Sequence, residues 1–257
     1  VGPNTHVSGG SCADPDYTVD GTADNVQIQA AIDAANSGDT VFLCAGTYHL
    51  ADVLYGNDHT VLQGAGQGVT IIDGGATFSD HEYQSGGGPI VNTLGTPVTI
   101  NDMTLTHGAT DGSGGAIYAS ADLIVDSVTF YEKAAYDGGA GAICANSGDV
   151  TIRNSTFSYN SSTSDGGAIG CSGHSLTIDG STFSHNTAGD WGGAIKTDAI
   201  LHVVNSEFDE NVADSNGGAI SSNSGDAAIV TGSRFLANLA SSGGGAVYAN
   251  ALHMVGS

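Results

Sequence analysis

Apolar and polar residues alternate in short segments along most of the chain. In Val150-Thr151-Ile152-Arg153, for example, the first and third residues are apolar and the second and fourth are polar. A strand with one buried face has this period of two, because its successive side chains point to opposite sides. Glycine-rich corners separate the segments, which predicts many short strands and few helices.

The segments recur every 25 to 27 residues, so each is one copy of a repeat. An apolar residue follows a glycine-rich corner in every copy: Ile90, Ile117, Ile143, Ile169, Ile195, Ile220 and Val247. After a first copy with Leu105, a second series is aromatic: Phe130, Phe157, Phe183, Phe208 and Phe235. Four of these phenylalanines are followed three residues later by asparagine: Asn160, Asn186, Asn211 and Asn238.

A repeat of this length with short strands is typical of one coil of a parallel β-helix, a solenoid in the all-β class. Neighbouring coils lie about 4.8 Å apart, so each residue of the repeat stacks on its counterpart. We therefore expect ladders of isoleucine, phenylalanine and asparagine, with right-handed winding. The asparagine ladder is interpreted as structural, because stacked amides satisfy buried turn carbonyls.

The N-terminal part has a different pattern. Residues 1–39 are predicted to form an N-terminal segment with a capping helix, and residues 40–257 the parallel β-helix. Asp24 and Gln27 resemble a capping box at the start of an amphipathic helix over residues 26–35. Thr40–Tyr48 reads as the first strand. A helix here would cover apolar surface that the first coil otherwise exposes.

The opposite end of the predicted solenoid is open. Ser257 lies where Ser233 lies in the preceding copy, two residues before the aromatic position. The pattern places the next phenylalanine at position 259, so the β-helix is expected to be C-terminally incomplete. Further coils, another domain or a partner molecule are expected to follow.

Two groups of motifs resemble known families. Gln29-Ala30-Ala31-Ile32-Asp33, Gly38-Asp39-Thr40-Val41 and Gly46-Thr47-Tyr48 resemble the opening of pectin-lyase-like right-handed β-helices. The Gly-Gly-Ala-Ile and Phe-x-x-Asn motifs resemble the repeats of polymorphic outer membrane proteins. The resemblance covers roughly residues 22–257 and implies the fold and a secreted or cell-surface location. It does not imply one function, because β-helices include lyases, hydrolases, adhesins and passive stalks.

Composition and charge narrow the possible partners. The chain has 257 residues with 40 glycines, and 27 acidic against 4 basic residues give a net charge of −23. This balance argues against nucleic acids and anionic membranes, which attract lysine and arginine. No apolar run is long enough to span a membrane.

Four cysteines are interpreted as two disulfides, with four buried thiols as the alternative. We expect Cys12–Cys44 to tie the N-terminal segment to the first coil. Cys144 and Cys171 are about one coil apart, which is within disulfide range if the register shifts by one residue.

No residue is assigned as catalytic, cofactor-binding or metal-ligating. The few cations (Lys133, Lys196, Arg153 and Arg234) lie outside recognisable lyase motifs. Asp73, Asp80 and His81 flank or lie in the irregular stretch 74–88, which has the character of an insertion loop. Ca²⁺ is a weak possibility because aspartate precedes several glycine corners, at Asp111, Asp137, Asp165 and Asp190. These residues are also ordinary turn formers.

The sequence favours a non-catalytic secreted or cell-surface β-helix with an adhesive or extracellular structural role. Its expected partner is an extracellular glycan or protein surface, or further copies or domains at the open end. Two alternatives stay open. The first is a polysaccharide lyase or glycoside hydrolase, and the second is a subunit of an extracellular filament.

Overall fold

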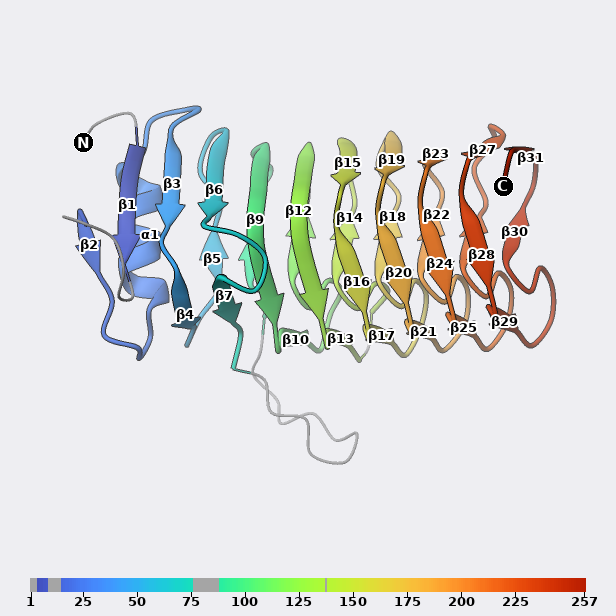
Figure 1. Cartoon of the computed structure of the whole chain (residues 1–257), viewed down its shortest axis with the longest axis horizontal. Coiled ribbons are helices and arrows are strands. Elements are labelled where there is room, and N and C mark those ends of the chain that lie inside the picture. Colours follow the sequence, from blue (N-terminus) through green and yellow to red (C-terminus); the bar gives the residue numbers. More distant parts are fainter. Residues whose placement is uncertain (1–3, 9–14, 76–87, 137) are drawn as a thin grey trace.

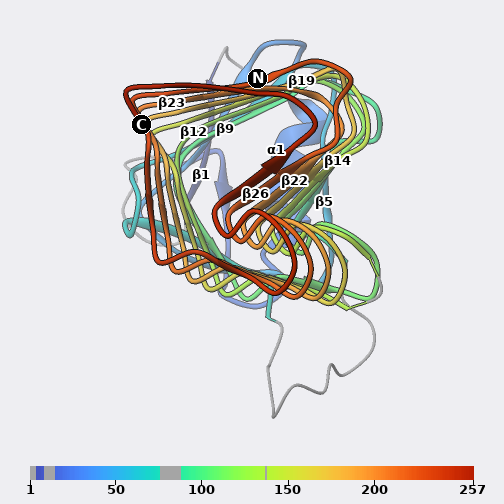
Figure 2. The same ribbon diagram turned by 90° about the vertical axis from the view of Figure 1, so that its right-hand side faces the viewer.

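The chain winds into a solenoid of parallel strands, with one coil stacked on the next along the long axis (Figure 1). The computed structural model describes residues 4–8, 15–75, 88–136 and 138–257. Viewed along the long axis, successive coils follow nearly the same outline (Figure 2). The predicted all-β parallel solenoid with one short helix is confirmed.

The described strands form three sheets along the solenoid. The long sheet has 17 strands: β1 (Asn4–Ser8), β2 (Tyr17–Thr18), β3 (Thr40–Leu43), β4 (Gly46–His49), β6 (Thr60–Gly64), β7 (Thr70–Asp73), β9 (Val98–Thr106), β12 (Leu123–Tyr131), β15 (Asp149–Arg153), β16 (Thr156–Ser158), β19 (Ser175–Asp179), β20 (Thr182–Ser184), β23 (Ile200–Val204), β24 (Glu207–Asp209), β27 (Ala228–Thr231), β28 (Arg234–Leu236) and β31 (Leu252–Val255). The corner sheet has six strands: β10 (Ala109–Thr110), β13 (Ala134–Ala135), β17 (Ser161–Ser162), β21 (Thr187–Ala188), β25 (Val212–Ala213) and β29 (Leu239–Ala240). The back sheet has eight: β5 (Leu54–Tyr55), β8 (Val91–Asn92), β11 (Ile117–Ala119), β14 (Ile143–Ala145), β18 (Ile169–Cys171), β22 (Ile195–Thr197), β26 (Ile220–Ser222) and β30 (Val247–Ala249).

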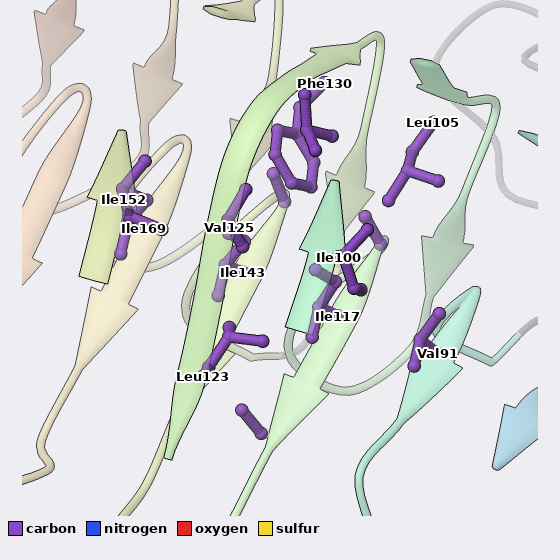
Figure 3. Close-up of a cluster of buried hydrophobic side chains, with 14 of the residues drawn as sticks. Val91, Ile100, Leu105, Ile117, Leu123, Val125, Phe130, Ile143, Ile152 and Ile169 are labelled. Atoms are coloured by element: carbon purple, nitrogen blue, oxygen red, sulfur yellow. The ribbon is translucent and has the colours of Figure 1, made fainter. Parts of the chain in front are cut away.

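Equivalent residues of successive coils lie opposite one another. In the long sheet, Phe130 pairs with Phe157, Phe157 with Phe183, and Phe183 with Phe208. The rings of these pairs are parallel to within 4–6°, with centroids 4.4–4.8 Å apart. The isoleucine series pairs in the same way across the back sheet. These side chains fill the interior of the coils (Figure 3).

The asparagine ladder stabilises the turn that follows each phenylalanine. Asn186 is fully buried, and its Nδ2 donates to the carbonyl of Phe157 and to Oδ1 of Asn211. Its Oδ1 accepts from the backbone N–H and the Nδ2 of Asn160. Each buried amide therefore satisfies backbone groups of a neighbouring coil, which water cannot reach.

The glycine corners allow close approach between coils. A Cβ on Gly167 would lie 2.1 Å from the carbonyl oxygen of Gly193 in the next coil, and a Cβ on Gly193 would lie 2.1 Å from that of Gly218. Any larger residue would therefore clash with backbone at these positions. This explains why the Gly-Gly motif recurs.

The helix α1 (Asn25–Ala34) packs its buried residues Ile28, Ala31 and Ile32 against the first coils. The expected capping box is not formed. Asp24 is at the N-cap but has helical φ and ψ, and its carboxylate makes no cap hydrogen bond. Instead it accepts hydrogen bonds from the backbone N–H groups of Gly21 and His49. The carboxylate thus ties the start of the helix to β4.

The segment predicted as one strand over residues 40–48 forms two strands, β3 and β4. Gly46 has a φ of +153°, which L side chains rarely adopt, and the chain bends between the two strands.

No described helix is long and apolar enough to cross a membrane.

The expected Cys144–Cys171 disulfide is wrong, because both residues are buried free thiols. The register pairs Cys144 with Gly170, and Cys171 with Ala145. The two cysteines are therefore one position out of step, and their side chains point to opposite faces of the back sheet. Cys12 lies outside the described residues, so its pairing with the buried Cys44 remains a prediction.

Candidate functional site

An outward-facing row of polar and aromatic side chains follows one corner of the solenoid. It lies where the second half of each long-sheet strand ends, at the lower tips of the arrows β7, β9, β12, β16, β20 and β24 in Figure 1. We call this the carboxylate–aromatic row; its members are His49, Asp73, His107, Tyr131, Glu132, Tyr159, His185 and Glu210.

Backbone conformation places the row on the surface. Glu132, Tyr159 and His185 each lie two residues after a ladder phenylalanine. They have positive φ values of 54–55°, in the left-handed region that non-glycine residues rarely adopt. The next residue of each coil then points inward, to the asparagine ladder. The ladder turn therefore forces one outward side chain per coil at this position.

The N-terminal half of the row is a cluster of histidines and carboxylates. Oδ1 of Asp73 lies 3.1 Å from Nδ1 of His107, and Oδ2 of Asp73 lies 3.7 Å from Nδ1 of His49. The other ring nitrogen of His107, Nε2, lies 3.7 Å from Oε2 of Glu132. The imidazole of His107 is thus held between two carboxylates contributed by different coils.

The C-terminal half is aromatic, with carboxylates at both ends. The ring of Tyr159 stacks on His185 with centroids 4.8 Å apart, and Tyr131 approaches Tyr159 edge-on at 5.9 Å. Nε2 of His185 lies 3.0 Å from Oε2 of Glu210. Tyr159 is 53% exposed, although one face of its ring is covered by His185. The pKa of Tyr131 is raised, chiefly because its hydroxyl hydrogen-bonds with Glu132.

A buried lysine lies beneath the row. Lys133 is 1% exposed, and its Nζ has no hydrogen-bond partner among the residues that the structure describes. Burial lowers the pKa of this amine well below its usual value, and the charges of Asp73 and Glu132 oppose this shift without cancelling it. Lys133 is at the position of the repeat that asparagine occupies in later coils. One coil earlier, the equivalent residue is Gly108. An unpaired buried amine is costly, so this coil departs from the ladder at a loss of stability.

Most of this row was not anticipated from the sequence. The sequence singles out Asp73, which is part of the row, and it also singles out Asp80 and His81, which lie outside the described residues. The other three cations lie away from the row: Lys196 pairs with Asp198 at 2.6 Å, Arg234 pairs with Glu207, and Arg153 is on β15. The available signal was positional, because His107, Glu132, Tyr159, His185 and Glu210 all lie two residues after a ladder position.

The sequence suggests Asp111, Asp165 and Asp190 as Ca²⁺ ligands, and these described residues form no metal-binding cluster. Within the described ranges, no group of three or more His, Cys, Asp or Glu residues is placed to hold a metal ion. Oδ1 of Asp165 instead accepts a hydrogen bond from the backbone N–H of Trp191 at 3.1 Å, which is a turn role. Asp137 lies outside the described residues.

Comparison with known proteins assigns the family. The sequence pattern of the right-handed β-helix region matches residues 51–250, so the chain belongs to the right-handed β-helix family. A search of curated protein sequences gave no match.

Three solved structures align with the chain at low similarity. The A-module of the Azotobacter vinelandii mannuronan C-5 epimerase AlgE4 shares 16% identity at a TM-score of 0.35, covering 92% of this chain and 93% of its own. The A-module of AlgE6 from the same organism shares 18% identity at 0.37, covering 84% and 71%. ORF18 of Geobacillus virus E2 shares 14% at 0.37, covering 87% and 57%. Scores this low carry no argument about function.

Proposed function

We propose that this protein is a non-catalytic secreted or cell-surface β-helix that binds a partner molecule along the carboxylate–aromatic row. The observation that carries the proposal is the exposed aromatic cluster of Tyr131, Tyr159 and His185 on three successive coils, in which Tyr159 stacks on His185 and meets Tyr131 edge-on. Exposed aromatic side chains of this kind offer a ligand apolar contact area at low entropic cost. The solenoid backbone fixes the positions of the three residues relative to one another, so little ordering is needed on binding.

The test is binding of the folded protein to arrayed glycans and peptides. Tyr159→Ala should remove the bound signal, because it deletes the central ring of the stack. Tyr248→Ala is the matched control, since Tyr248 is 39% exposed on the back sheet, away from the row. Binding that both variants retain equally would contradict the proposal, as would the absence of binding by the wild type.

A polysaccharide-active enzyme is the second candidate, favoured by one specific observation. The contact of His107 with Asp73 is the arrangement in which a carboxylate orients a histidine for proton transfer. The experiment is an assay for new reducing ends and unsaturated products on a panel of polysaccharides. Turnover that His107→Ala abolishes would replace the binding proposal with a catalytic one.

A further inference from the structure

The negative charge of the carboxylate–aromatic row indicates which class of partner can bind to it. At the two ends of the aromatic stack are Glu132 and Glu210, and Asp73 lies further along. The row contains no lysine or arginine, and the whole chain has 27 acidic residues against 4 basic ones. Electrostatic complementarity therefore favours a cationic partner and disfavours an anionic polysaccharide.

The exposed tyrosines Tyr131 and Tyr159 favour the same kind of partner. A lysine or arginine side chain is attracted to the face of a tyrosine ring, and the planar arginine guanidinium also stacks on it. Asp209, the neighbour of Glu210 in the chain, adds another carboxylate at this end of the row.

The spacing of the row matches an extended polypeptide. Glu132 and Glu210 are separated by three coils, or about 14 Å at a coil spacing of about 4.8 Å. An extended chain advances about 3.4 Å per residue, so side chains four residues apart also lie about 14 Å apart. Residues i, i+2 and i+4 of such a chain would point to the same side, and residue i+2, about 7 Å along, would lie between Tyr159 and His185.

We infer that the carboxylate–aromatic row binds an extended basic segment of a partner protein, with lysine or arginine residues four positions apart meeting Glu132 and Glu210. This inference rests on the proposed binding function and names its ligand. Between the two cations, Tyr159 and His185 together contact an apolar residue or a third cation. Because the coil spacing is fixed, it determines which residues of the bound segment meet Glu132 and Glu210.

The experiment measures binding of a fluorescent Gly/Ser peptide that carries two arginines four residues apart. Its comparison peptide has the same composition with the arginines adjacent. We expect the spaced peptide to bind more tightly and to weaken as salt is raised. Tyr159→Ala should weaken it about tenfold, and Glu132→Gln and Glu210→Gln about threefold each.

Two variants control for the general acidity of the protein. Asp226→Asn removes one charge from an exposed position outside the row, and Tyr248→Ala removes an exposed ring from the back sheet. Both should bind the spaced peptide as the wild type does. Equal binding of the two peptides, unaffected by Tyr159→Ala, would overturn the inference.

The same titration with a neutral oligosaccharide and a chitosan oligosaccharide separates this inference from the proposed function. Binding of either sugar that depends on Tyr159, without binding of the spaced peptide, would overturn the basic-segment inference and leave the row as a binding face. If no peptide or sugar depends on Tyr159, both proposals fail.

Discussion

The backbone N–H of Lys133 donates a hydrogen bond to Oδ1 of Asn160 at 3.1 Å, as the N–H of Asn160 does to Asn186. The backbone of Lys133 therefore makes the same contact as the backbone of a ladder asparagine, but its side chain does not continue the ladder. Asparagines at this position donate to the carbonyl of the phenylalanine one coil earlier. The Lys133 amine makes no such bond, and within the described part of the chain this buried group has no hydrogen-bond partner.

This buried amine should make stability depend on pH. Because its pKa is lowered only in the folded state, the unfolded chain binds the extra proton between the lowered value and the usual 10.5. The free energy of unfolding therefore rises with pH across this window, by about 1.4 kcal/mol for each unit of pKa difference. Lys133→Met removes the effect and should be the more stable protein at neutral pH.

Urea denaturation of both proteins over this pH range provides the measurement. Other groups that titrate at high pH, such as Tyr131 and Cys144, are common to both proteins and cancel in the difference. A difference between wild type and Lys133→Met that stays constant with pH would show that the amine is not desolvated as described.

The asparagine ladder should be sensitive to removal of an interior amide. Asn186→Ala leaves the carbonyl of Phe157 and the N–H of Asn160 without partners in the interior. Each unsatisfied buried group costs about 1–3 kcal/mol, so the total loss should exceed about 2 kcal/mol. Asn36→Ala is the control, because the Asn36 side chain is exposed and water can replace its hydrogen bond to Asp39. Thermal or urea unfolding should rank the two losses in this order.

The phenylalanine stack should stabilise the fold as a buried hydrophobic core does. The ring of Phe183 lies between Phe157 and Phe208, at 4.7 and 4.8 Å, and is fully buried. Phe183→Ala should lower the free energy of unfolding by about 3–5 kcal/mol. His185→Ala, two residues away on the surface, should change it by about 0.5 kcal/mol. Similar losses in the two variants would mean that the inward and outward faces are wrongly placed.

The cysteines should react slowly in the folded protein. Burial raises the pKa of Cys144 to about 11 and that of Cys171 above its usual value, so neither is a thiolate near neutral pH. A thiol reagent should label neither Cys144 nor Cys171 in the folded protein. In denaturant without reductant, it should label two thiols per chain. Four labelled thiols in denaturant would contradict the predicted Cys12–Cys44 bridge, and fast labelling of the folded protein would contradict the burial.

The period of the sequence by itself determines which residues stack in this protein. In a solenoid each residue pairs with its counterpart one repeat later, so the spacing from Phe157 to Phe183 is also their register. The same spacing predicted the buried asparagines, since each follows a phenylalanine by three residues. For the same reason Lys133 is recognisable in the sequence as the exception to the ladder.

Only the tertiary structure decided how side chains meet across coils. A shift of one residue reverses the face of a strand, so the spacing of Cys144 and Cys171 suggested a bridge that the register forbids. Asp73 and His107 come together although 34 residues separate them, more than one repeat. Equivalent residues of successive coils form a column along the solenoid, and Asp73 and His107 belong to neighbouring columns, because Asp73 pairs with Thr106. The left-handed backbone of His107 directs its side chain toward Asp73. Periodicity predicts contacts within one column, whereas contacts between columns depend on backbone angles that the sequence pattern does not show.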